Sequence, residues 1–143
     1  MRLVDANVLL HAVNTDAAEH TAARRWLEAS LNGLEPVGFA WVVLLAFLRI
    51  GTRPGILPTA LTVDEAGGYV EGWLAQPPAV VVHPTTRHLG VLRGLLAGTG
   101  SAGNLTSDAH LAALAVEHDA EVWSFDRDFG RFVGLRWRHP SGS

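Results

Sequence analysis

The sequence predicts an α/β fold of three layers, in which a mainly parallel central sheet is flanked by helices. Short apolar runs alternate with segments of helical periodicity along the chain, and this alternation favours a parallel sheet covered on both faces. The acids support the same fold, because Asp5 and Asp126 each directly follow an expected strand. Sites in such folds form beyond the carboxyl ends of the strands, so we expect these acids to converge.

The first part of the chain predicts one strand and two helices. Met1–Val4 is a short apolar run typical of a strand, and the apolar residues of Asn7–Val13 continue as a short helix. Asp16 and Glu19 have the spacing of a capping box. They predict the start of a second helix, which ends at Gly33.

The middle of the chain is more apolar. Pro36–Phe39 predicts a second strand, which leads into Trp41–Ile50. That segment is apolar nearly all round, which indicates a helix buried on most sides or packed on a partner subunit. Thr62 and Glu65 form a second capping box and predict a helix that runs to about Ala75.

The remaining expected elements alternate in the same way, with β-branched runs between helices rich in leucine and alanine. They are a strand at 79–83, a helix at 86–97, a flexible connection at 98–103, a helix that contains Asp108 and ends near Asp119, a strand at 120–125 and a short strand at 134–138.

Composition restricts the possible classes of function. The 143 residues, 48% of them apolar and 17% charged, suit one domain over 1–139 with a short tail at 140–143. The net charge of −3 gives no general attraction to nucleic acid, so a polyanion must be held by local arginines or by metal ions. Cysteine and lysine are absent, which excludes thiolate, Schiff-base and Walker-type phosphate chemistry.

The sequence predicts neither a signal peptide nor a membrane span. The longest apolar run ends before Arg49 and is too short to cross a bilayer, while Arg2 and Asp5 interrupt the apolar N-terminus. We therefore expect a cytoplasmic protein without membrane contact.

Four aspartates carry the chemistry that we expect. Asp5 follows the first strand, Asp108 lies at the start of the core-facing stripe of a late helix, and Asp126 and Asp128 follow the late strand. Each alone has a simpler interpretation, because aspartate also caps helices and forms turns.

Brought together, the four carboxylates repel each other by roughly 4 kcal/mol per pair at about 4 Å. Protonation of one acid can offset this, but a hard divalent cation such as Mg²⁺ or Mn²⁺ is the simpler solution for four acids. Such ions activate water for hydrolysis of phosphodiester bonds.

Three motifs occur in order along the chain: Asp5-Ala6-Asn7 after the first strand, the run from Asn104 to His110, and the run from Ser124 to Phe129. In this order they resemble the PIN domain over essentially the whole chain, and the closest resemblance is to VapC toxins, the ribonucleases of type II toxin-antitoxin pairs. The resemblance implies metal-dependent endoribonuclease activity on RNA. The implied metal ligands are Asp5, Asp108, Asp126 and Asp128, the first three of them catalytic, with Asn7 and Ser124 in support.

The resemblance also implies partners, namely a VapB-type antitoxin and a second copy of the chain in a homodimer. Arg49 and Arg127 are candidates for contact with RNA phosphates, although ordinary solvated arginines explain them almost as well.

One position departs from the PIN pattern. PIN nucleases usually carry a glutamate on the helix in mid-chain, in a pattern like LLEFLR, and here Ala46 stands in its place. Alanine cannot bind metal. One alternative is therefore a catalytically weakened PIN fold that acts by binding RNA or an antitoxin. A second alternative, independent of Ala46, is a phospho-accepting receiver domain, which is also an α/β fold with acids at strand ends but whose usual lysine is missing here.

Overall fold

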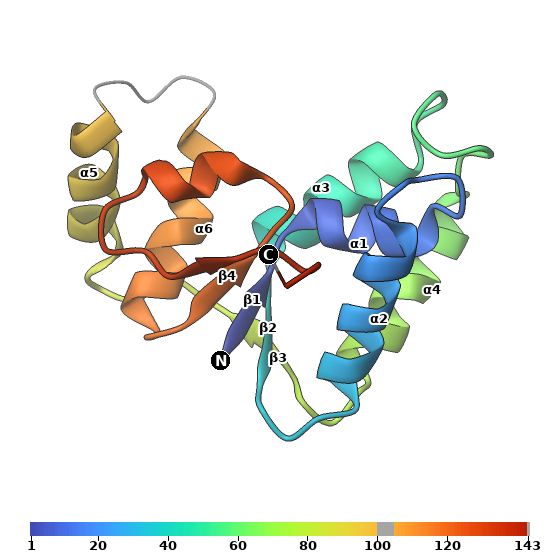
Figure 1. The fold of residues 1–143 in the computed structure, drawn as a ribbon, viewed down its shortest axis with the longest axis horizontal. Coiled ribbons are helices and arrows are strands. Elements are labelled where there is room, and N and C mark those ends of the chain that lie inside the picture. Colours follow the sequence, from blue (N-terminus) through green and yellow to red (C-terminus); the bar gives the residue numbers. More distant parts are fainter. Residues whose placement is uncertain (100–104, 143) are drawn as a thin grey trace.

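The computed structural model describes residues 1–99 and 105–142 and contains a parallel sheet in the order β3-β2-β1-β4-β5 (Figure 1). The strands are β1 (Arg2–Val4), β2 (Val37–Ala40), β3 (Ala79–Val82), β4 (Glu121–Trp123) and β5 (Trp137–Arg138). The predicted α/β fold is confirmed. The flexible connection expected at 98–103 lies mostly outside the described residues, as does Asn104.

The helices follow the strands in sequence. They are α1 (Ala6–Val13), α2 (His20–Leu31), α3 (Trp41–Gly51), α4 (Val63–Leu74), α5 (His88–Thr99), α6 (Thr106–Glu117) and the 3₁₀ helix η2 (Arg127–Arg131). In Figure 1 the sheet lies between the α5–α6 pair on one side and α1, α2 and α4 on the other, which gives the expected three layers. No helix in the described part of the chain is both long and apolar enough to span a bilayer.

The core is formed where the sheet meets α3 and α6. All four residues of β2 are buried, as expected for a strand covered on both faces. Helix α6 buries Ala109 and every position from Leu111 to Ala115. Gly38 allows close packing within the sheet, because a Cβ atom there would lie 2.8 Å from Leu3 Cδ2 and from Val82 Cγ2.

One of the two predicted capping boxes is wrong and the other is confirmed. The capping box at Asp16 and Glu19 is wrong: α2 begins at His20, and Glu19 makes no side-chain cap bond. The Asp16 N–H instead donates to Asn14 Oδ1 at 3.1 Å within a turn. The box at Thr62 and Glu65 is confirmed, with both reciprocal bonds present at 2.9 and 3.0 Å.

Helix α3 is less buried than the sequence indicates. Val43, Leu44 and Phe47 face the core, whereas Trp41 is 48% exposed and Leu45 is 54% exposed. These two residues stand one turn apart, so they form a small apolar surface on the outer side of the helix.

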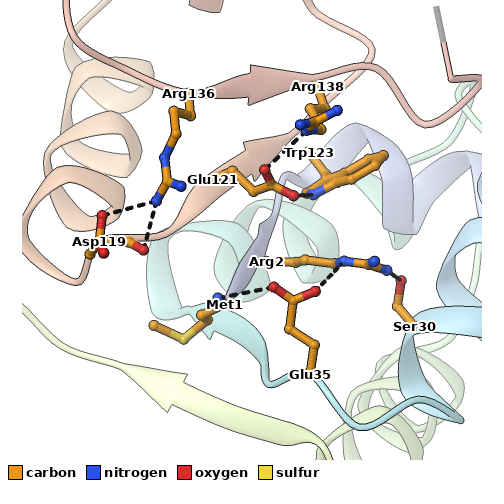
Figure 2. A network of polar contacts seen from close by, with 9 residues as sticks. All are labelled: Met1, Arg2, Ser30, Glu35, Asp119, Glu121, Trp123, Arg136 and Arg138. Carbon is orange, nitrogen blue, oxygen red and sulfur yellow. Dashed lines mark hydrogen bonds and ion pairs between the residues drawn. The ribbon is translucent and has the colours of Figure 1, made fainter.

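Polar contacts join the segments around the amino ends of β1 and β4 (Figure 2). The Glu35 carboxylate accepts a hydrogen bond from the N-terminal ammonium of Met1 at 3.2 Å and forms an ion pair with Arg2 Nε at 2.9 Å. Glu121 pairs with Arg138 Nε at 3.0 Å, which links β4 to β5. These pairs are partly exposed, so each stabilises the fold by less than about 1 kcal/mol.

The carboxyl ends of β1 and β4 lie side by side. The chain adds β2 and β3 on one side of β1 and then continues with β4 and β5 on the other, so the order of strands reverses between β1 and β4. Val4 pairs with Trp123, and the Asp5 N–H donates to the Trp123 carbonyl at 3.0 Å. Open α/β sheets place their ligand sites at such a switch point.

Candidate active site

Asp5 leaves β1 at this switch point and also caps α1. Its Oδ1 accepts from the Ala6 N–H at 2.7 Å, and its Oδ2 accepts from the Ser124 hydroxyl at 2.7 Å. Asp5 therefore has the capping role that aspartate commonly takes, and its carboxylate is also tied to the end of β4.

Asn7 and Ser124 connect the ends of β1 and β4 by hydrogen bonds. Asn7 Nδ2 donates to Ser124 Oγ at 3.0 Å and to Asp5 Oδ2 at 3.3 Å. Asn7 Oδ1 accepts from the Phe125 N–H at 3.2 Å, and Ser124 is fully buried. Residues more than one hundred positions apart in the chain thus hold the Asp5 carboxylate in one orientation.

Asp126 and Asp128 lie in the turn after β4. The Asp126 N–H donates to Ser124 Oγ at 3.0 Å, and Asp126 Oδ1 accepts from the Asp128 N–H at 2.9 Å, which caps η2. The Asp128 side chain is 50% exposed and its Oδ1 lies 3.5 Å from Arg131 Nε. Asp126 is therefore joined to Asp5 through Ser124, while Asp128 lies further towards solvent.

Asp108 reaches the site from the first turn of α6. It lines a cavity of about 190 Å³ together with Asp5. The other walls of this cavity come from α1, α3 and α6, namely Ala6, Val42, Val43, Ala46, Arg49, Ser107 and Leu111. The structure thus brings Asp5 and Asp108 to one cavity, whereas Asp126 and Asp128 do not line it.

The acids perturb one another. Burial raises the pKa of Asp108 to about 6, helped by the negative charges of Asp5, Asp126 and Asp128. Burial also raises the pKa of Asp5; the hydrogen bonds from Ser124 and Ala6 oppose this, and the charge of Asp126 adds to it. The three segments therefore share one electrostatic environment that disfavours the ionised form of at least two carboxyl groups.

The donor chemistry of the cavity suits a hard divalent cation. Among residues 1–99 and 105–142, no three histidine or acidic side chains lie close enough together to hold an ion. Mg²⁺ needs fewer protein ligands, because it is usually bound by one or two carboxylates and keeps several waters or phosphate oxygens. Asp5 and Asp108 supply two such carboxylates at one cavity, and a positive charge there would stabilise their ionised forms, which burial and the neighbouring negative charges disfavour.

Three other positions singled out in the sequence can now be placed. Arg49 lines the acid cavity, so its guanidinium is available to an anion bound there. Arg127 is exposed and follows Asp126 in the turn. Ala46 also lines the cavity, so the missing glutamate would have pointed at the site.

A second buried polar network lies between α5 and α6 and was not predicted. Glu117 has no exposed side-chain surface, and its Oε1 accepts from the Thr85 N–H at 2.8 Å and the Thr85 hydroxyl at 2.5 Å. Its Oε2 contacts His88 Nδ1, and His88 Nε2 lies 2.9 Å from His110 Nδ1. His110 is thus turned towards α5, although it follows Asp108 closely in sequence. No short-range pattern links these residues, since 29 positions separate His88 from Glu117.

The PIN domain family model matches residues 2–135. The chain therefore belongs to the PIN domain family, and the receiver-domain alternative is wrong. Among curated proteins it is 53% identical to Ribonuclease VapC37 from Mycobacterium tuberculosis, over 98% of this chain and 97% of that protein. It is 40% identical to Ribonuclease VapC33 from the same species, over 98% of both chains. Within the family, the chain is a VapC-type PIN-domain protein.

Solved structures agree on the fold. The crystal structure of VapBC2 from Rickettsia felis, bound to a DNA fragment of its promoter, matches with a TM-score of 0.71 at 14% identity, covering 96% of this chain and 97% of that one. VapC20 from M. tuberculosis, described as a toxin that cleaves the sarcin-ricin loop, matches with a TM-score of 0.70 at 19% identity, covering 95% and 99%. At these identities the likeness concerns the fold alone.

Proposed function

We propose that this protein is a metal-dependent endoribonuclease that acts as the toxin of a toxin-antitoxin pair. The observation that carries the proposal is the cavity shared by Asp5 and Asp108, at the switch point of a PIN fold. Relatives that are 40–53% identical over nearly the whole chain are named ribonucleases, which supports RNA as the substrate.

In this proposal Asp5 and Asp108 hold Mg²⁺ or Mn²⁺. Asp126 adds negative charge beside them, and Asp128 does so from a position nearer to solvent. A bound divalent ion supplies Lewis acidity for hydrolysis of the phosphodiester bond. Ser124 and Asn7 keep Asp5 oriented through the bonds at 2.7 and 3.3 Å, so the carboxylate needs little rearrangement when it binds. Arg49 provides a positive charge at the cavity for a phosphate oxygen, and the exposed Arg127, next to Asp126 in the turn, is a second candidate for a phosphate contact.

The experiment is RNA cleavage by purified protein with Mg²⁺ or Mn²⁺ and with EDTA, for wild type and for Asp5→Asn. Asp16→Asn serves as the matched control, because Asp16 is exposed in a turn away from the cavity. We expect wild type and the control to cleave only with metal, and Asp5→Asn to be nearly inactive. Equal cleavage by wild type and Asp5→Asn in EDTA would refute the proposal.

The alternative of a catalytically weakened PIN fold depends on Ala46. The names of the relatives do not favour it, but the position of Ala46 on the cavity wall makes it testable. Saturating metal that gives no turnover, together with tight RNA binding, would support this alternative.

We also propose an antitoxin of the VapB type and a homodimer as partners. Several matching structures are complexes titled VapBC, which supports the antitoxin. A groove of about 820 Å³ between α2 and α4, lined in part by Leu27, Tyr69 and Trp73, offers an apolar surface for it. The exposed pair Trp41 and Leu45 on α3 offers a surface for a second copy. Light scattering at micromolar concentration tests the dimer, and a monomer would contradict it.

A further inference from the structure

Three partly exposed rings form a cluster beside the acid site. His11 comes from α1, Phe125 from the turn after β4, and His139 from the segment after β5. The ring centre of Phe125 lies 5.2 Å from that of His11 and 4.8 Å from that of His139, with interplanar angles of 86° and 87°. These edge-to-face contacts join three segments that are far apart in the sequence.

The cluster is attached to the same residues that hold the acids. Phe125 lies between Ser124 and Asp126, and its N–H donates to Asn7 Oδ1 at 3.2 Å. His11 belongs to the helix that Asp5 caps. The rings are therefore joined through Phe125 to the residues that hold Asp5 and Asp126, while none of the three lines the acid cavity itself.

His139 is held as a neutral ring. The Ser141 N–H donates to its Nδ1 at 3.3 Å and the Ser141 Oγ lies 2.6 Å from the same atom, so Nδ1 accepts and Nε2 carries the proton. Burial lowers the pKa of His139, and the nearby charge of Arg127 adds to this effect while Glu19 opposes it. A neutral imidazole held by its own segment offers a flat surface to another ring.

We propose that His11, Phe125 and His139 form a stacking platform for one unpaired base of the RNA substrate. The inference rests on the proposed function and deepens it by naming the residues that would hold a base beside the reacting phosphate. Every base has a π-face, so a ring platform favours unstacked nucleotides with little sequence preference. The net charge of −3 makes such contacts more important, because the protein has no general electrostatic attraction for RNA.

The test separates base contacts from backbone contacts. Binding of three fluorescent strands of equal length is measured by anisotropy in EDTA, where the proposed cleavage is prevented: oligoadenylate, oligouridylate and an abasic ribose-phosphate strand. The proteins are wild type, His139→Ala and Phe125→Leu, which keeps an apolar side chain. Tyr69→Leu is the control, because Tyr69 is a 43% exposed aromatic ring on α4, outside the cluster.

Wild type should bind oligoadenylate roughly 5- to 100-fold more tightly than the abasic strand, the range expected for base–aromatic stacking, with oligouridylate in between. In His139→Ala and Phe125→Leu the ratio of the affinity for oligoadenylate to the affinity for the abasic strand should fall towards one, while the affinity for the abasic strand stays unchanged. Tyr69→Leu should keep the wild-type ratio. A ratio of one in wild type, or an unchanged ratio in both cluster variants, overturns the platform. A loss of affinity for all three strands alike would also overturn it, because that result indicates a structural role.

Failure of the proposed nuclease function and failure of the stacking platform give different results. Absence of metal-dependent cleavage with the base-dependent ratio intact would remove the nuclease and leave the platform. Normal cleavage with the ratio unaffected by the variants would remove the platform and leave the nuclease.

Discussion

Replacing Asp108 with asparagine keeps the size of the side chain and removes its charge. The pKa of Asp108 is raised from 3.8 to about 6, so its ionised form is less favourable in the folded protein than in the unfolded chain. Each pH unit of such a difference corresponds to about 1.4 kcal/mol, which puts the cost of ionised Asp108 near 3 kcal/mol at neutral pH. Asp108 is partly exposed, so solvent screening reduces the expected gain for Asp108→Asn to about 1–2 kcal/mol.

The sign of the pH dependence follows from the raised pKa. Above pH 6 the wild-type carboxyl is ionised in both states and the full cost is present. As the pH falls from 6 towards 3.8, the folded protein takes up the proton first, and the cost disappears. The stability advantage of Asp108→Asn should therefore be largest above pH 6 and shrink steadily as the solution is acidified.

The assay is thermal unfolding in EDTA at several pH values between 4 and 8. At neutral pH we expect Asp108→Asn to melt roughly 2–8 °C above wild type, from about 2–4 °C per kcal/mol for a domain of this size. Asp16→Asn, in an exposed turn, should melt with wild type. An Asp108→Asn protein no more stable than wild type at neutral pH, or equally stabilised at every pH, would refute the electrostatic reasoning.

Other variants test the packing and the second polar network. Glu117→Gln should lower the free energy of unfolding by about 1–3 kcal/mol, because it weakens the buried hydrogen bonds with Thr85 and His88, whereas Arg24→Ala, in an exposed pair, should leave the denaturant midpoint nearly unchanged. A small effect of Glu117→Gln would contradict the buried network. Gly38→Ala should destabilise the protein by about 1–3 kcal/mol, because its Cβ would come within 2.8 Å of side chains from β1 and β3. Gly67→Ala, with open space around the new methyl group, should instead stabilise α4 by about 0.5–1 kcal/mol, and equal effects of the two substitutions would argue against the close approach in the sheet.

The convergence of Asp5 with Asp126 could be predicted because it follows from local patterns. Each of these two acids follows a strand pattern in the sequence, and parallel strands bring their carboxyl ends to the same edge of the sheet. The sequence could not show that β1 and β4 are neighbours with Val4 opposite Trp123, because register depends on long-range packing. The sequence predicts that all four acids share one metal site, whereas only Asp5 and Asp108 line the cavity in the structure.

The capping box at Asp16 failed for a local reason. The motif predicts that the Asp16 side chain caps the helix, but the chain before His20 forms turns, and Asn14 Oδ1 accepts the Asp16 N–H instead. His20 Nδ1 also contacts the His11 carbonyl at 2.9 Å, which ties α2 to the end of α1. Helix α2 thus begins at His20, about one turn after Asp16.

The central claim is that Asp5 and Asp108 together create the site for a divalent ion. Binding of Mn²⁺ to the metal-free protein, followed by electron paramagnetic resonance, tests it without depending on an RNA substrate. The account predicts saturable binding to wild type and to Asp16→Asn, and at least about tenfold weaker binding to Asp5→Asn and to Asp108→Asn, because each removes one charged oxygen ligand. Mn²⁺ binding of equal strength in all four proteins would contradict it.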